Sequence, residues 1–339
     1  MISENAKRFF ENYLGKKSSE FVTLAQSGSA RVNFWAQSDN RKYIITYNEN
    51  IQENESFFYY SEVFSALHLN TPTIFTISED RKIYVQEFLG ETTLSEIIAK
   101  ESLSSNVKSL VQQTLEKLYQ LQILTQNKID YSKTFEYEKY DDLPVTHDLY
   151  YFKNFVADVL ELEYHKSTLL QEFKKIVSLI ESLEPKGLMI RDFQARNIMV
   201  NNDNNVAFID YQSAMYGPLM YDVISFLFQA KANFPEIFKN EMLDFYIHQF
   251  ENLETQHQLK NSVKPIQLMR FLQVLGAYGF RGLIQRKQHF IASIEKGIEN
   301  ITEFAQNWEN MKDYPELEKV IQQLSLEKTR LKIKEILNT

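Results

Sequence analysis

Cysteine is absent from the 339 residues of this chain, and glycine (9) and proline (7) are scarce. Without cysteine there is no disulfide framework and no thiolate metal site, a composition compatible with a reducing cytoplasm. The opening segment, MISENAKRFFENYLGKK, carries charges throughout and lacks the apolar core of a secretory signal. No run approaches the roughly 20 apolar residues of a membrane span. We therefore expect a cytoplasmic protein with no membrane partner.

Positive charge is also in short supply, because 37 Lys and Arg face 45 Asp and Glu, which gives a net charge of −8. An acidic surface disfavours nucleic acid as a partner. The six histidines form no metal-ligand cluster with suitable spacing. Hydrophobic residues make up 44% of the chain, enough for a large core, and the length suits two lobes better than one.

The chain is organised around residues 187–212, GLMIRDFQARNIMVNNDNNVAFIDYQ. Here Asp192 stands five positions before Asn197, which precedes a short apolar run. An Asn- and Asp-rich connection follows, and a second apolar run then leads to Asp210. Two β-prone runs joined in this way predict a hairpin. A hairpin of that length folds Asp210 back beside Asn197, with Asp192 on the loop that enters it.

Two carboxylates and a carboxamide that converge in this way suit phosphoryl transfer. One Asp must orient, or accept a proton from, the attacking hydroxyl. An Asn and a second Asp must supply hard oxygen ligands to a Mg²⁺ ion that bridges the nucleotide phosphates. The alternative is an ordinary polar hairpin in which Asn and Asp only serve the turn. The second Asp, at the close of the hairpin, favours the catalytic interpretation.

The remaining pattern predicts an α+β fold with a small antiparallel sheet followed by a larger, mainly helical part. We expect five strands, at 21–25, 33–37, 42–47, 74–77 and 83–88. Helices are expected at 2–14 and 53–69, and another is expected to begin at 92–98. Further helices are expected at 107–123, 149–162, 169–183, 221–228, 236–250, 266–278, 289–306 and 317–337. Segments 131–148 and 213–218 are expected to be loops. The predicted boundary separates an N-terminal nucleotide-binding lobe, 1–90, from a C-terminal catalytic lobe, 91–339.

The Asp192 to Asn197 loop and Asp210 resemble the catalytic loop and the metal-binding Asp of the protein-kinase-like fold. The ending Asp-Tyr-Gln, where protein kinases have Asp-Phe-Gly, is similar to the aminoglycoside phosphotransferase and choline kinase family. IRDFQARNIMV, FIDYQ and YGPLMYDVISFLFQAKANFP also resemble the anomeric kinases of N-acetylmuramate and N-acetylglucosamine within that family. The likeness extends from Phe21 to the helix at His289. It implies a two-lobed fold, ATP and Mg²⁺ as cofactors, and a sugar or amino sugar as the small-molecule substrate.

The resemblance also implies roles for particular residues. Asp192 would be the general base, with Arg191 beside it in the catalytic loop, and Asn197 and Asp210 would hold Mg²⁺. The resemblance implies three groups of nucleotide contacts. They are a phosphate loop of Ser27, Gly28, Ser29 and Ala30, a helix carboxylate at Glu55 with Glu62 as its alternative, and a hinge at Glu87 and Phe88. The candidate substrate contacts are Gln212, Asp222 and Arg281, although a structural role that caps a helix and braces the catalytic loop is favoured for Asp222.

Two departures from the family pattern leave questions open. Ile190 stands two positions before Asp192, where relatives usually carry His or an aromatic residue, and it can only pack. The third strand has no lysine near Thr46 to meet the phosphates, so either Lys42 or Arg31 supplies a cation, or no residue does. These departures motivate a catalytically silent, nucleotide-binding pseudokinase as one alternative function. An aminoglycoside phosphotransferase is the other.

Overall fold

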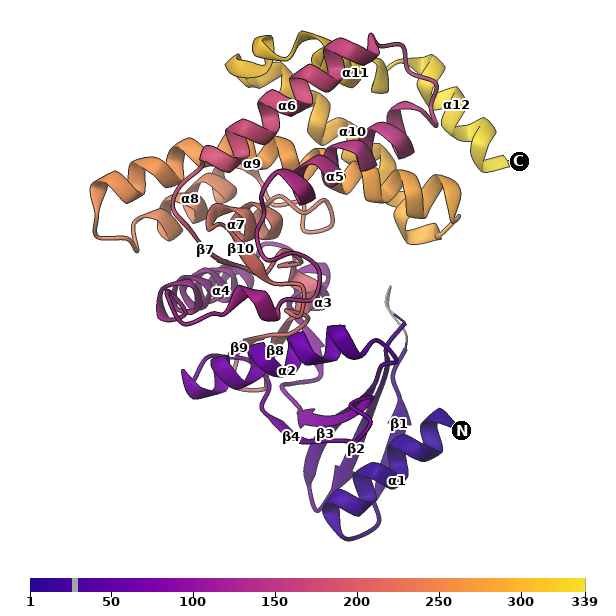
Figure 1. The fold of residues 1–339 in the computed structure, drawn as a ribbon, viewed down its shortest axis with the longest axis vertical. Helices are drawn as coiled ribbons and strands as arrows, with labels where there is room; N and C mark the ends of the chain where they lie inside the picture. The colour runs from indigo at the N-terminus through magenta and orange to yellow at the C-terminus, as the bar shows by residue number, and fades with distance from the viewer. Residues whose placement is uncertain (26–29, 339) are drawn as a thin grey trace. The chain divides into compact units, whose positions relative to one another are not determined.

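The computed structural model describes residues 1–25 and 30–338 (Figure 1). The chain forms two compact units, Met1–Glu138 with Gly187–Met215, and Lys139–Lys186 with Tyr216–Thr339. The predicted boundary at residue 90 concerns kinase-like lobes and stays a prediction. The compact units follow another division, because the first unit also includes the 91–138 segment and the hairpin that carries Asn197 and Asp210.

An antiparallel sheet of five strands forms the N-terminal part of the first unit, in the order β1-β2-β3-β5-β4. The strands are β1 (Glu20–Thr23), β2 (Val32–Ser38), β3 (Arg41–Tyr47), β4 (Ile74–Ile77) and β5 (Ile83–Glu87). All five predicted strands are present, with ends that differ by a few residues at most. The predicted α+β class, a small antiparallel sheet before a larger helical part, is confirmed.

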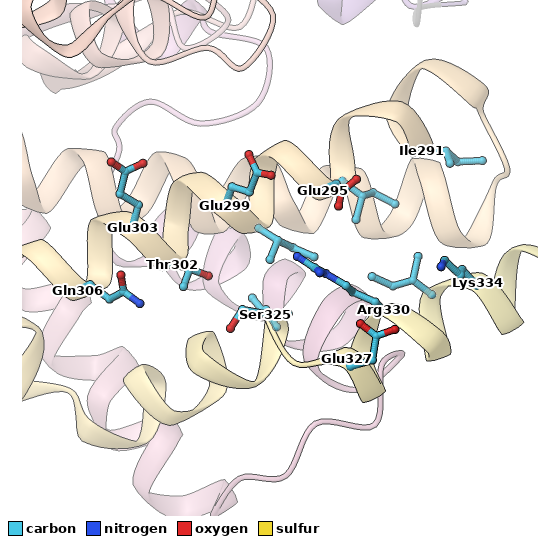
Figure 2. Close-up of a pocket in the computed structure, with 14 residues that line it drawn as sticks. Ile291, Glu295, Glu299, Thr302, Glu303, Gln306, Ser325, Glu327, Arg330 and Lys334 are labelled. Carbon is cyan, nitrogen blue, oxygen red and sulfur yellow. The ribbon is translucent and has the colours of Figure 1, made fainter.

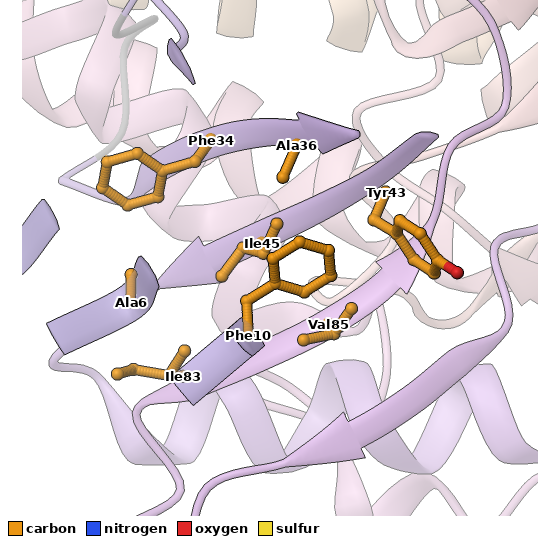
Figure 3. Close-up of a cluster of buried hydrophobic side chains, with 8 residues drawn as sticks. All are labelled: Ala6, Phe10, Phe34, Ala36, Tyr43, Ile45, Ile83 and Val85. Carbon is orange, nitrogen blue, oxygen red and sulfur yellow. The ribbon is translucent and has the colours of Figure 1, made fainter. Parts of the chain in front are cut away.

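Two helices cover the two faces of this sheet. Ala6 and Phe10 of α1 (Ile2–Leu14) pack on one face. Figure 3 shows these two side chains against buried residues of three strands: Phe34, Ala36, Tyr43, Ile45, Ile83 and Val85. Successive side chains of a strand point to opposite faces, so Tyr84 points the other way, and its ring packs against those of Phe57 and Phe58 of α2 (Ile51–Ala66). Each large apolar side chain buried in this way contributes about 1.5–3 kcal/mol.

The predicted catalytic hairpin supplies two strands, β8 and β9, of a second sheet in the first unit, which has three strands in the order β6-β8-β9. Strand β8 (Ile198–Val200) pairs antiparallel with β9 (Val206–Phe208), and β6 (Thr92–Thr93) pairs with β8. The Asn201 side chain closes the turn by accepting the N–H groups of Asp203 and Asn205. Helix α3 (Leu94–Glu101) begins with a capping box, and α4 (Ser105–Leu124) follows.

The second unit is helical. Its elements are α5 (Asp142–Phe152), α6 (Lys166–Ser182), α7 (Met220–Leu227), α8 (Glu236–Ile247), α9 (Leu253–Tyr278), α10 (Gln288–Asn307), α11 (Pro315–Leu324) and α12 (Glu327–Asn338). Helix α9 is the longest and contacts α5, α7 and α10. Strands β7 (Lys186–Met189) and β10 (Met215–Pro218) stand where the chain passes from one unit to the other.

Several details of the prediction are wrong. The helix expected at 266–278 begins earlier, at Leu253. Segment 131–148 is not all loop, since it holds a 3₁₀ turn, Tyr131–Lys133, and the start of α5. Segment 149–162 is α-helical only to Phe152 and continues as a π-helical turn, Lys153–Ala157. Strand β10 lies in the predicted loop 213–218. The single helix expected at 317–337 is two helices, α11 and α12.

No helix within residues 1–25 and 30–338 combines the length and the apolar character that crossing a bilayer requires.

Candidate functional site

Asn197 links the three residues that the sequence predicts to converge. It ends a 3₁₀ turn, Ala195–Asn197, directly before β8. Its Nδ2 donates to the carbonyl oxygen of Asp192 at 2.9 Å and to Oδ2 of Asp210 at 3.3 Å. The N–H of Ile209 donates to the Asn197 carbonyl oxygen, which fixes the hairpin end that carries Asp210. The first unit therefore brings Asp192, Asn197 and Asp210 together.

The backbone is strained on both sides of this group. Arg191 has φ 72° and Asp210 has φ 66°, a left-handed conformation that side-chain-bearing residues rarely adopt. Each such residue costs about 1–3 kcal/mol and tends to occur at functional sites. Ile190 supports the loop in two ways. The residue is buried, with 1% of its surface exposed, and its carbonyl oxygen accepts a hydrogen bond from the N–H of Asp192. Packing and a backbone hydrogen bond thus support the loop at this position.

Asp192 presents its carboxylate to solvent, with 38% of the side chain exposed. One of its oxygens accepts a hydrogen bond of 2.8 Å from Nη2 of Arg196, four residues further along the chain. The guanidinium of Arg191 lies 5.9 Å from the ring centre of Tyr137, a cation–π contact. The Asp192 carboxylate is the accessible member of the group, while Asn197 is buried.

Both oxygens of Asp210 accept hydrogen bonds. Oδ1 accepts from Nη2 of Arg31 and, at 3.0 Å, from Nε2 of Gln212, and Oδ2 accepts from Asn197. Burial works to raise the pKa of Asp210, but the charge and hydrogen bond of Arg31 outweigh it, and the pKa is lowered. Gln212 therefore belongs to the Asp210 group. Its predicted contact with substrate stays a prediction.

Arg31 also contacts the first turn of α2. Its Nε lies 3.6 Å from Oε1 of Glu53, whose other oxygen accepts a hydrogen bond of 2.8 Å from Nδ2 of Asn48. Burial works to lower the pKa of Arg31, but the charges of Asp210 and Glu53 are among the causes that raise it. The guanidinium is thus a permanent positive charge beside Asp210.

Glu55, the predicted helix carboxylate, lies elsewhere. Its Oε2 accepts a hydrogen bond of 2.6 Å from Nη2 of Arg81, and both side chains are more than 40% exposed. Sequence reasoning missed Glu53, although Asn50 three residues earlier marks the start of a helix. The Asn50 side chain accepts the N–H of Glu53 and so places this carboxylate in the first turn of α2.

Three buried hydrogen bonds hold α2 to the segment that follows Asp210. Ser56 Oγ donates to the Gln212 carbonyl oxygen, Tyr60 Oη donates to that of Ala214, and Ser61 Oγ pairs with Tyr211 Oη, each at 2.7 Å. The Tyr211 ring stacks on Phe57 at 5.0 Å, and burial raises the pKa of this tyrosine. The position of Asp210 is therefore coupled to that of α2 and Glu53.

The predicted hinge follows β5. The N–H of Glu87 donates to the Thr73 carbonyl oxygen at 2.9 Å, and the Phe88 ring lies 5.4 Å from Nζ of Lys42, which pairs with Glu91. Lys42 therefore lies at the hinge and not beside Asp210. Adenine binding by Glu87 and Phe88 stays a prediction. Of the predicted phosphate loop, residues 27–29 lie outside the described residues, and Ala30 is exposed.

The other two predicted substrate contacts belong to the second unit. Asp222 is fully buried in α7, and Arg281 lies in a π-helical turn, Gly279–Ile284, with its guanidinium 5.3 Å from the Phe290 ring centre. Their roles stay predictions. A cavity of about 730 Å³ lies between α10 and the α11–α12 segment (Figure 2). No predicted site residue lines it.

The site residues form no dense cluster of metal ligands. Over residues 1–25 and 30–338, no group of three or more His, Cys, Asp and Glu side chains has an arrangement that would hold a metal ion. Mg²⁺ in phosphoryl-transfer enzymes commonly uses only one or two protein carboxylates, with phosphate oxygens and water completing its shell. The Asn197 and Asp210 pair fits that pattern.

Comparison with known proteins gives a family match over residues 22–260, to the phosphotransferase enzyme family APH. The N-acetylmuramate/N-acetylglucosamine kinase of Neisseria meningitidis serogroup B is 28% identical over 188 residues, which cover 54% of this chain and 52% of that protein. The chain thus spans about half the length of this curated relative.

Solved structures share the fold at low sequence identity. The choline kinase LicA from Streptococcus pneumoniae gives a TM-score of 0.61 at 13% identity, over 89% of this chain and 99% of that one. A thermostable mutant of aminoglycoside phosphotransferase APH(4)-Ia, in complex with ADP and hygromycin B, gives 0.57 at 15% identity, over 87% and 98%. An ethanolamine kinase of Plasmodium vivax gives 0.59 at 13% identity, over 87% and 83%. The predicted protein-kinase-like fold is confirmed.

Proposed function

Because the chain belongs to the phosphotransferase enzyme family, we propose that it transfers the γ-phosphoryl group of ATP to a hydroxyl of a sugar or amino sugar. The observation that carries the proposal is the bonding of Asn197 to both Asp192 and Asp210 in one compact unit. This arrangement supplies a solvent-accessible carboxylate next to a pair of hard oxygen ligands, as phosphoryl transfer to an alcohol requires.

In this proposal Asp192 is the general base. Its exposed carboxylate accepts the proton of the attacking hydroxyl as that oxygen forms a bond to the γ-phosphorus. The bond between the γ-phosphorus and the bridging oxygen breaks, and ADP leaves with that oxygen. Arg196, hydrogen-bonded to Asp192, keeps the carboxylate oriented between turnovers.

Asn197 and Asp210 are the residues that would hold Mg²⁺. Asn197 uses its Nδ2 on Asp192 and Asp210, which leaves its carbonyl oxygen Oδ1 as the ligand atom. The lowered pKa of Asp210 keeps that carboxylate ionised, as a metal ligand must be. When bound, the metal neutralises charge on the nucleotide phosphates.

The sugar preference rests on the similarity to the Neisseria N-acetylmuramate/N-acetylglucosamine kinase. The competing function is a nucleotide-binding protein without catalysis. It is favoured by one observation, that Arg31 and Gln212 take the Oδ1 atom of Asp210.

Transfer of isotope from γ-labelled ATP to a panel of amino sugars tests the proposal. The wild-type protein should label at least one sugar, and Asp192→Asn should lower the rate about 100-fold or more while it still binds nucleotide. Asp203→Asn, in the exposed turn of the same hairpin, is the matched control and should keep the wild-type rate. Binding of MgATP without transfer to any member of a broad panel would contradict the proposal and favour the non-catalytic function.

A further inference from the structure

The third strand carries no cation where the family resemblance leads one to expect a lysine. Thr46 occupies that position, with its side chain almost fully buried. Its hydroxyl donates to Oδ1 of Asn33 at 2.8 Å and accepts from Nε2 of Gln86 at 3.2 Å. These neutral side chains satisfy one another. Strand β3 therefore contributes no positive charge to the phosphate site at this position.

Arg31 leaves the sheet on the same side as Thr46. Asn33 pairs directly with Thr46 in the β2–β3 register. Arg31 stands two residues before Asn33, and side chains two residues apart along an extended chain share a face. From there the guanidinium reaches Glu53 of α2 and Asp210. A strand lysine in the kinase-like arrangement would pair with the corresponding helix carboxylate.

Asp210 and Glu53, the two carboxylates that contact Arg31, differ in whether they have a second proposed role. Asp210 is needed as a metal ligand, and coordination at its Oδ1 requires the Arg31 contact to loosen. Glu53 has no such second task. It is fixed by Asn48 and lies at the N-terminal end of α2. The side chains of Arg31 and Glu53 are each only 17% exposed, so this pair is shielded from solvent and from salt.

We propose that Arg31 supplies the phosphate-binding cation in place of the missing strand lysine, and that Glu53 anchors it there. This inference rests on the proposed function. A guanidinium carries five N–H donors in a planar fork, so Arg31 can keep its contact to Glu53 while it turns other donors from Asp210 to phosphate oxygens. Arg31 is then a nucleotide-binding residue, and Glu53 is a positioning residue that acts through it.

The chain provides a matched control within the same helix. Arg81 forms an ion pair with Glu55, as Arg31 does with Glu53, and both glutamates belong to α2. The Arg81 and Glu55 pair is joined by two hydrogen bonds, whereas Nε of Arg31 lies 3.6 Å from Oε1 of Glu53. Two residues along a helix correspond to about 200° of rotation, so Glu55 points away from the site. The Arg81 and Glu55 pair is also the more exposed of the two. Substitutions there remove the same chemical groups without reaching Asp210.

Calorimetric titration with a non-hydrolysable ATP analogue in excess Mg²⁺, and separately with adenosine, tests the inference. Arg31→Met should weaken binding of the analogue about 10- to 100-fold, because charge-assisted contacts to phosphate are lost. Its affinity for adenosine should stay within about twofold of wild type. Arg31→Lys should recover part of the loss, and Glu53→Gln should weaken the analogue about three- to tenfold. Arg81→Met and Glu55→Gln should bind both ligands as the wild type does.

Equal affinity of Arg31→Met and Arg81→Met for the analogue would overturn the inference. So would a parallel loss of analogue and adenosine, since that pattern indicates general damage to the site. If thermal melting shows that Arg31→Met does not fold, the test uses Arg31→Lys and Glu53→Gln instead. Affinities for the analogue equal to that of Glu55→Gln would then overturn the inference. If the wild-type protein binds the analogue but phosphorylates no substrate, the proposed function is contradicted and the inference about Arg31 is not. Wild-type protein that binds neither ligand removes both.

Discussion

At the scale of single residues, two glutamates of α2 show how one helical position decides a role. Glu53 lies beside Arg31, whereas Glu55 pairs with Arg81 near the surface. The sequence offers both carboxylates, and helix periodicity alone separates them by about 200° without saying which one faces the site. The residue at which the helix starts indicates which of the two glutamates faces the site. Asn50 caps α2 two residues earlier than the apolar pattern indicates, and this places Glu53 in the first turn.

Tyr60 is the residue whose loss should be felt most directly in the stability of this region. Its hydroxyl is buried and donates to the Ala214 carbonyl oxygen. Tyr60→Phe should lower the free energy of unfolding by about 1–2 kcal/mol, because a buried carbonyl oxygen loses its hydrogen-bond donor. Urea unfolding of the whole protein measures the change.

Tyr59→Phe is the neighbouring control for that measurement. The Tyr59 hydroxyl accepts the N–H of Asp130 in an exposed part of the structure. Its loss should change stability by no more than about 0.5 kcal/mol. Equal midpoints for the two variants would contradict the assigned role of Tyr60 in tying α2 to the segment after Asp210.

At the scale of elements, Gly90 sets how closely the predicted hinge after β5 approaches the hairpin of β8 and β9. Its φ is 146°, and a Cβ atom there would lie 2.6 Å from the carbonyl oxygen of Val200. Gly90→Ala should therefore cost about 2–4 kcal/mol and also weaken adenosine binding, since either the hinge or β8 must shift.

Gly15→Ala provides the comparison, because Gly15 also has a positive φ, 67°, but no atom lies within 4 Å of the added Cβ. Only the conformational cost of about 1 kcal/mol applies at this helix end. Thermal unfolding and an adenosine titration on both variants make the measurement. If Gly90→Ala proved no worse than Gly15→Ala, the close approach of hinge and hairpin would have no energetic weight.

The elements that the sequence predicts well are those with strong local signals. Gly15 ends α1 where expected, and the Asn- and Asp-rich turn defines the hairpin of β8 and β9. The break between α11 and α12 has no Pro or Gly to mark it. There the hydroxyls of Ser325 and Thr329 bond carbonyl oxygens at the end of α11, a local competition that periodicity does not reveal.

Pro144 misled the prediction in the opposite direction. A proline in segment 131–148 leads us to predict a loop. This proline lies in the first turn of α5, where its missing N–H costs nothing. Likewise, the site residues Asp192, Asn197 and Asp210 follow from spacing in one hairpin. The contact between Arg31 and Asp210 joins residues 179 apart, and no local pattern encodes it.

At the scale of the whole molecule, the residues proposed for two tasks belong to different compact units. Every residue proposed here for nucleotide and metal belongs to the unit that contains Met1–Glu138 and Gly187–Met215. Asp222 and Arg281, the predicted substrate contacts outside the Asp210 group, belong to the other unit. Metal-dependent nucleotide binding is therefore expected to depend on the first unit and to be separable from the choice of sugar.

The most direct test of the central claim is the Mg²⁺ dependence of nucleotide binding, measured by calorimetry with a non-hydrolysable ATP analogue in Mg²⁺ and in EDTA. Wild-type protein should bind the analogue at least about tenfold more tightly with Mg²⁺. Asp203→Asn should match it, while Asp210→Asn should show no gain from Mg²⁺, because a metal ligand is lost. A full Mg²⁺ gain in Asp210→Asn, or none in the wild type, would contradict the assignment of Asn197 and Asp210 as the metal site.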